Sequence, residues 1–169
     1  MTYRLFGVFL VVLGCGTWGC ILASKYRQEC KTLEQLLHLL QIMESELQYH
    51  MTPLPDLCLI AADSVNGVMH DIFTALSQEL NQQISPNVSL CMRRVLSTRS
   101  APIYTNILLE KLGKTLGRFD YNGQLKGIEA VHHEAQCKLA TLMNNQDARI
   151  RSYRTFGLCA GLAIVILLI

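Results

Sequence analysis

The sequence predicts an all-α protein, a six-helix bundle flanked by one transmembrane helix at each terminus. Three observations carry this prediction. Each terminus holds an uncharged apolar run, apolar residues between the runs recur every three or four positions, and no segment alternates with a period of two. We expect a transmembrane helix over 5–24, an all-helical domain over 25–152 and a second transmembrane helix over 153–169.

The first apolar run is long enough to cross a bilayer. Residues 5–24 contain no charge, and at about 1.5 Å per residue a helix of that length reaches about 30 Å. Ala23-Ser24 is a poor cleavage site and Lys25 follows at once, so an uncleaved span is favoured over a secretory signal. The second run, 155–169, is shorter, about 22 Å at the same rise. It can span if its helix begins near Tyr153 and Arg154 extends back to the interface.

Basic residues flank the middle domain on its membrane side. By the positive-inside rule this places the domain in the cytoplasm and both termini on the far face. Only Arg4 lies beyond the spans, whereas six bases lie next to the domain: Lys25, Arg27, Lys31, Arg149, Arg151 and Arg154.

Six helices are expected in the middle domain from capping signals and apolar periodicity. Thr and Ser before proline are read as N-caps, and Asn66-Gly67 as a helix end. The first three helices are expected over about 26–49, from Thr52-Pro53 to Gly67, and over 69–80. The fourth is expected to begin at Ser85-Pro86, the fifth at Ser100 to Pro102, and the sixth after a turn at 117–120. No proline lies in 122–169, so the sixth helix can continue into the membrane, as the first can continue from its own span.

Closely spaced glycines have two interpretations. Gly157 and Gly161 in the second run, with Gly16 and Gly19 in the first, permit close packing of membrane helices, although glycine is also simply common in spans. Gly113 and Gly117 in the soluble domain fit either a close helix crossing or helix termination at Gly117.

The residue patterns of common active sites do not occur. The cysteines lack the paired spacing of a zinc site, adjacent His132 and His133 point in different directions on a helix, and Gly113-Lys114-Thr115 lacks the leading glycine of a phosphate loop. Residues 25–154 carry 13 acids and 14 Lys or Arg, too balanced for a nucleic-acid binder. We expect no enzyme activity, no cofactor, no metal and no nucleic-acid partner.

Several stretches along the chain form a recognisable pattern: 17–19 (Thr-Trp-Gly), 44–47, 49–54, 112–120 with Gln124, and 151–157. No single one of these motifs is specific, but their order and spacing together are. Through them the chain as a whole resembles the stage III sporulation protein AB family of endospore-forming bacteria.

The resemblance implies a component of the channel between mother cell and forespore. The family's soluble domain is similar to the cytoplasmic domains of the platform protein of type II secretion and type IV pilus systems. This implies a non-enzymatic membrane subunit on the mother-cell side, linking a cytosolic secretion-type ATPase to other membrane subunits of the channel. The alternative is a stand-alone membrane-anchored adaptor or signalling protein with one cytosolic partner.

Binding is expected through exposed charged side chains that the apolar faces of the helices do not require. The candidate residues are Arg93 and Arg94 with Arg99, and Arg118 and Asp120 at the turn before the sixth helix.

Overall fold

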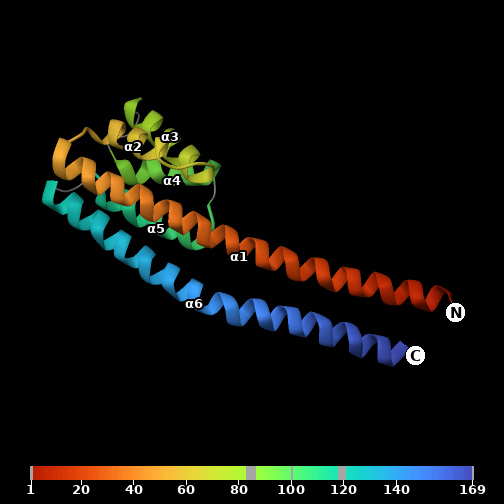
Figure 1. The fold of residues 1–169 in the computed structure, drawn as a ribbon. Helices are drawn as coiled ribbons and strands as arrows, with labels where there is room; N and C mark the ends of the chain where they lie inside the picture. The colour runs from red at the N-terminus through yellow and green to blue at the C-terminus, as the bar shows by residue number, and fades with distance from the viewer. Residues whose placement is uncertain (1, 83–86, 100, 118–120, 169) are drawn as a thin grey trace. The chain divides into compact units, whose positions relative to one another are not determined.

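The structure, a computed structural model, describes the backbone of residues 2–82, 87–99, 101–117 and 121–168, and the side chains of 24–82, 87–99, 101–117 and 121–144. The described residues form six helices and no strand, which confirms the all-α prediction (Figure 1). The helices are α1 (Thr2–His50), α2 (Leu54–Asp63), α3 (Val68–Asn81), α4 (Val88–Thr98), α5 (Ile103–Thr115) and α6 (Tyr121–Leu168).

The chain forms two compact units. The first consists of Met1–Gln28 with Ala140–Ile169, and the second of Glu29–Leu139. The first and last helices are unbroken, as the absence of proline allows. In the first unit the Tyr26 hydroxyl donates a hydrogen bond of 2.5 Å to the Leu142 carbonyl and joins α1 to α6.

The predicted spans, 5–24 and 153–169, fall almost wholly outside the residues whose side chains the structure describes. Within the described residues, no helix combines the length and the apolar character needed to cross a membrane.

A single apolar core fills the second unit. It is built from one face of each helix, as the three-to-four periodicity predicts. Leu33, Leu36, Leu40 and Met43 of α1 are fully buried. The other helices of this unit also contribute fully buried side chains: Leu57, Met69, Ile72, Phe73, Leu76, Met92, Leu108, Leu112 and Ile128.

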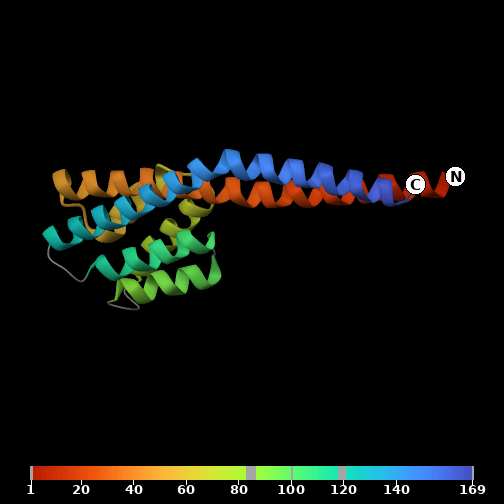
Figure 2. The same cartoon turned by 90° about the horizontal axis from the view of Figure 1, so that it is seen from below.

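Four helices of this unit pack in chain order, α2 on α3, α3 on α4 and α4 on α5. Figure 1 shows α2 and α3 above α1 and α5 and α6 below it, and Figure 2 shows the same helices from below. Among the described residues α2 and α5 share no close backbone contact along their lengths, although Gly117, two residues after α5, lies close to the Leu54 side chain at the start of α2.

The helix starts lie near the predicted positions, but two predicted caps are wrong. The N-cap of α2 is Pro53, because the Thr52 hydroxyl instead donates to Glu46 Oε2 at 3.1 Å. The N-cap of α4 is Asn87, whose side-chain oxygen accepts from the Ser89 N–H at 3.1 Å; Ser85 lies outside the described residues.

Both interpretations of the soluble-domain glycines are correct, one at each position. A Cβ at Gly113 would lie 2.8 Å from Met92 Cβ, so this glycine permits the close crossing of α4 and α5. Gly117 has φ +74°, a left-handed conformation that ends α5. A further close approach, which was not predicted, lies at Gly127 of α6, where a Cβ would lie 2.6 Å from Thr115 Cβ.

Candidate partner-binding surface

The predicted arginine surface lies on α4 and at its C-terminal end. Arg93 and Arg94 are adjacent in sequence but reach different neighbours. Arg93 Nε lies 3.9 Å from Glu110 Oε1 on α5, and Arg94 Nη1 lies 2.9 Å from Glu79 Oε2 on α3. Helix geometry separates successive side chains by about 100°, so α4 contacts both neighbouring helices through this pair.

Arg99 follows the last turn of α4 and also points toward α3. Its Nη1 donates a 2.5 Å hydrogen bond to the backbone carbonyl of Asp71. The three arginines therefore connect α4 to α3 and α5, although the side chains of Arg93 and Arg94 remain 67% and 51% exposed. Exposed ion pairs contribute little to stability, so these side chains stay available to a partner.

The other predicted site residues lie outside the residues or the side chains that the structure describes. Arg118 and Asp120 lie in 118–120, outside the described residues. Gly16, Gly19, Gly157 and Gly161 belong to helices α1 and α6, but they lie in stretches whose side-chain environment is not described.

A polar cluster that the sequence analysis missed joins α5 to α6. Lys111 Nζ donates to both carboxylate oxygens of Glu134 at 2.6 and 2.8 Å, and the Tyr104 hydroxyl donates to Glu134 Oε1 at 3.4 Å. The ammonium of Lys138 lies 4.3 Å from the centre of the Tyr104 ring, within cation–π range. Burial, and then the nearby Glu134 charge, raise the pKa of Tyr104, which keeps this hydroxyl protonated as a donor.

A second missed pair lies on the exposed side of α6. Cys137 Sγ is 3.8 Å from His133 Nε2, a spacing of four residues that the sequence could have revealed. The described residues contain no group of three or more potential metal ligands, so this pair is not part of a larger cluster there.

The cysteines of the second unit fall into two classes. Burial raises the pKa of Cys58 to about 12, and burial is also the main cause of the raised pKa of Cys30 and Cys91. These three side chains are buried, whereas Cys137 is exposed. The buried cysteines remain protonated thiols at neutral pH and act as small apolar core residues.

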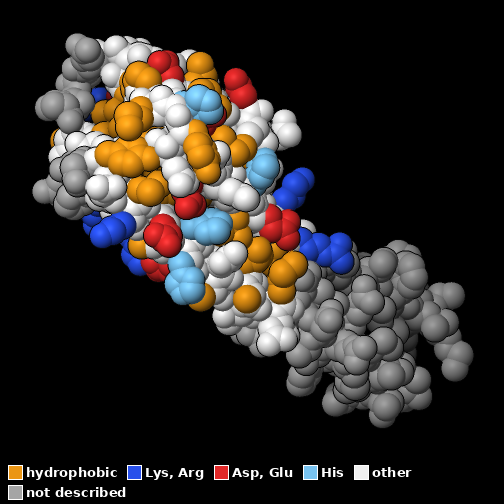
Figure 3. Space-filling model, turned by 60° about the vertical axis from the view of Figure 1, so that its left-hand side comes forward, with side chains coloured by type: hydrophobic (Ala, Val, Ile, Leu, Met, Phe, Trp, Pro, Cys, Tyr) orange, Lys and Arg blue, Asp and Glu red, His pale blue; other side chains and the backbone are white. Residues whose placement is uncertain are grey.

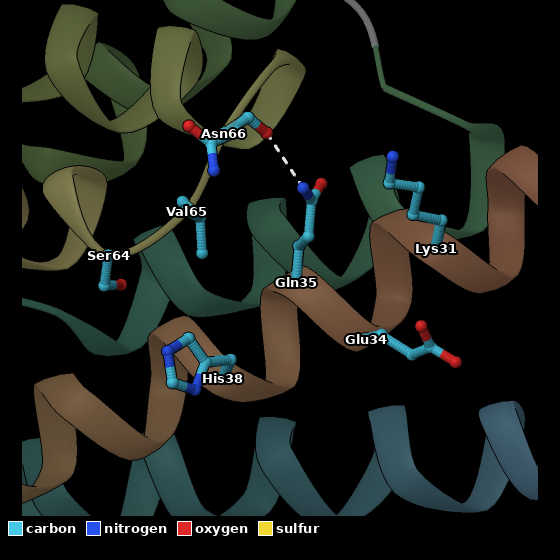
Figure 4. A pocket seen from close by; sticks show the side chains of 7 residues that line it. All are labelled: Lys31, Glu34, Gln35, His38, Ser64, Val65 and Asn66. Carbon is cyan, nitrogen blue, oxygen red and sulfur yellow. Dashed lines mark hydrogen bonds between the residues drawn. The ribbon is translucent and has the colours of Figure 1, made fainter.

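A hollow of about 280 Å³ lies between α1 and the loop that joins α2 to α3. Figure 4 shows Gln35 and His38 of α1 facing this loop, with Gln35 Nε2 donating to the Asn66 carbonyl at 2.9 Å. The hollow is open to solvent and its polar side chains are largely exposed. Its hydrogen bond holds the loop against α1.

Comparison with known proteins gives a consistent result along almost the entire chain. The family model for stage III sporulation protein AB matches residues 4–169. A relative, stage III sporulation protein AB of Bacillus subtilis (strain 168), is 24% identical over 168 residues, covering 98% of each chain. A solved structure of stage III sporulation protein AB shares the fold with a TM-score of 0.61 and 24% identity, over 72% of this chain and 98% of that one. The resemblance seen in the sequence is confirmed, and the chain belongs to the stage III sporulation protein AB family.

Proposed function

We propose that this sporulation protein is a non-enzymatic platform subunit of the channel between mother cell and forespore. In this role it links a cytosolic secretion-type ATPase to the membrane subunits of the channel. The observation that carries the proposal is the continuity of α1 and α6, each of which extends from the helical bundle into the apolar terminal sequence without a break.

Continuous helices suit a coupling role. A helix transmits displacement along its axis better than a flexible linker does, so a movement imposed on the bundle would reach both terminal segments. We infer that residues 5–24 and 153–169 are the two membrane anchors and that the bundle lies in the mother-cell cytoplasm. The excess of basic residues next to the bundle supports this orientation.

The ATPase contact is proposed to run through the arginines of α4, with the 118–120 turn as a second candidate. Arg93 and Arg94 are more than half exposed. Replacing both with Glu changes the surface charge strongly and removes two exposed ion pairs, each of which contributes at most about 1 kcal/mol to stability. Like-charge contact with an acidic partner surface would weaken association by several kcal/mol.

Capture of the ATPase by the full-length protein, solubilised in detergent, tests this surface. Arg93→Glu with Arg94→Glu should abolish capture. Lys126→Glu with Asn122→Asp and Gln136→Glu is the matched control, because it changes net charge equally at other exposed positions and should capture normally. Normal capture by the arginine double variant would transfer the proposal to the 118–120 turn. No capture by the unsubstituted protein would count against direct contact.

Co-purification from sporulating cells separates the platform role from the adaptor role. A platform subunit should bring down several membrane proteins together with the ATPase. An adaptor should bring down a single soluble partner, and that result would replace the platform proposal.

A further inference from the structure

Charge is distributed unequally between the two helical hairpins of the second unit. Residues 51–82, which contain α2 and α3, hold four carboxylates and no Lys or Arg, a formal charge of −4. Residues 87–117, which contain α4 and α5, hold five Lys or Arg and one Glu, a formal charge of +4. One ion pair between α3 and α4, Arg94 with Glu79, uses part of this charge within the molecule, and Arg99 donates to the backbone carbonyl of Asp71.

The outward side of α2 carries two of the remaining carboxylates next to exposed aliphatic side chains. Asp56, Leu59, Ile60 and Asp63 follow a spacing of three, four and seven residues, so they share one side of the helix. Leu59 and Ile60 are 44% and 40% exposed, and both aspartates are exposed. Neither aspartate forms an ion pair with another described residue. We call these four residues the acidic face.

The outward side of α5 has the opposite charge. Ile103 and Ile107, one turn apart, are 83% and 45% exposed, and the exposed Lys114 lies two turns further on. Arg93 of α4 lies beside this surface, where it faces Glu110 at 3.9 Å, leaving Lys114 without an acidic partner among the described residues. We call Ile103, Ile107, Lys114 and Arg93 the basic face. Exposed Glu110 lies on the same side of α5, so the face has a net charge of +1.

The two faces match each other in chemistry and both are open to solvent on one molecule. Each combines a pair of exposed aliphatic side chains with charges of a single net sign, acidic on α2 and basic on α5. No ion pair joins the two faces among the described residues, so one bundle presents both faces to its surroundings. Figure 3 shows hydrophobic side chains gathered on one region of the surface beside acidic and histidine side chains, with Lys and Arg at the margins.

We propose that the acidic face of one copy of this chain docks on the basic face of a second copy. Burial of the aliphatic pairs supplies the attraction, while the charges select the orientation and exclude contact between like faces. Because the two surfaces differ, the contact is heterologous and repeats from copy to copy, producing a ring if the rotation closes and a filament if it does not. The proposal concerns this chain alone and does not depend on the ATPase contact. Arg93 belongs to both proposed surfaces, so within one copy the two contacts compete for this side chain.

Charge reversal on separate copies tests the pairing. The full-length protein is reconstituted in detergent, without other proteins, and association is followed by sedimentation. Asp56→Lys with Asp63→Lys, and separately Arg93→Glu with Lys114→Glu, should each lower the association constant at least tenfold. Mixing the two variants should restore association, because each copy then finds an oppositely charged face on the other. Absence of association in the unsubstituted protein, or no recovery on mixing, would overturn the proposal.

Cysteine cross-linking tests the geometry independently of charge. In a Cys137→Ser background, a copy with Ile60→Cys should form a disulfide-linked dimer with a copy carrying Ile107→Cys. Neither variant should cross-link to itself above the level of the Cys137→Ser chain. A dimer formed by the Ile60→Cys variant alone would indicate a symmetric contact between acidic faces and would contradict the proposal. Sedimentation and cross-linking both use this chain only, so a negative result leaves the proposed platform function standing.

Discussion

At Gly113 the crossing of α4 and α5 leaves no room for a side chain. The site is helical, where Ala would otherwise be favoured over Gly by about 1 kcal/mol. However, the added Cβ would lie 2.8 Å from Met92 Cβ, which is fixed closely to the α4 backbone. Overpacking of this kind costs about 1–3 kcal/mol, so we expect Gly113→Ala to lower the thermal midpoint. Gln78→Ala on the exposed side of α3 should leave the midpoint nearly unchanged. A rise for Gly113→Ala would show that the helices can separate at little cost.

At Met51 a side chain is present where the backbone conformation favours glycine. Met51 has φ +51° at the end of α1 and its side chain is 75% exposed, so few contacts offset its left-handed backbone. Non-glycine residues are disfavoured in this conformation by roughly 1 kcal/mol. Met51→Gly should therefore raise the thermal midpoint, while Tyr49→Gly, two residues earlier within α1, should lower it. If Met51→Gly lowered the midpoint instead, the side chain would have a stabilising contact that its exposure does not suggest.

At the scale of the element, the start of α4 depends on Asn87. Its side chain accepts the Ser89 N–H, one of the donors that the first turn leaves without a helical partner. Replacing an N-cap residue with Ala typically costs about 1 kcal/mol, so Asn87→Ala should lower the thermal midpoint by a few degrees. Ser85→Ala, at the cap that the sequence alone predicts, should have little effect. The reverse ranking of the two variants would restore Ser85 as the cap.

The same helices show what local sequence can and cannot predict. The apolar faces, including the one that contains Leu33, Leu36 and Leu40, can be predicted from periodicity, because residues three or four positions apart lie on the same side of a helix and are buried together. The caps were misplaced because Thr52 has a competing acceptor, Glu46, that only the folded turn brings within reach. Nor does sequence say which helix a glycine faces, so the approach of Gly127 to Thr115 was missed.

At the scale of the whole molecule, the fold separates charges that appear mixed along the sequence. Net charge near zero in the middle domain hides the separation of −4 and +4 between its two hairpins, which appears only when the charges are assigned to packed helices. The predicted arginine surface also changes meaning in the fold, because Arg94 and Arg99 hold α3 as well as facing solvent. Individual side chains can thus contribute to cohesion and remain accessible to partners.

The side of the membrane on which the bundle lies is a property of the whole molecule. Labelling of the Cys137 thiol can determine it. Cys137 is exposed, whereas Cys30, Cys58 and Cys91 are buried and their raised pKa values keep them as unreactive thiols at neutral pH. A membrane-impermeant maleimide should therefore leave the protein unlabelled in intact bacterial cells and label it in inverted membrane vesicles. Cys137→Ser should remove that labelling, which assigns the signal to the bundle and not to the cysteines in 5–24 and 153–169. Labelling of Cys137 in intact cells would place the bundle outside the cytoplasm and exclude contact with a cytosolic ATPase.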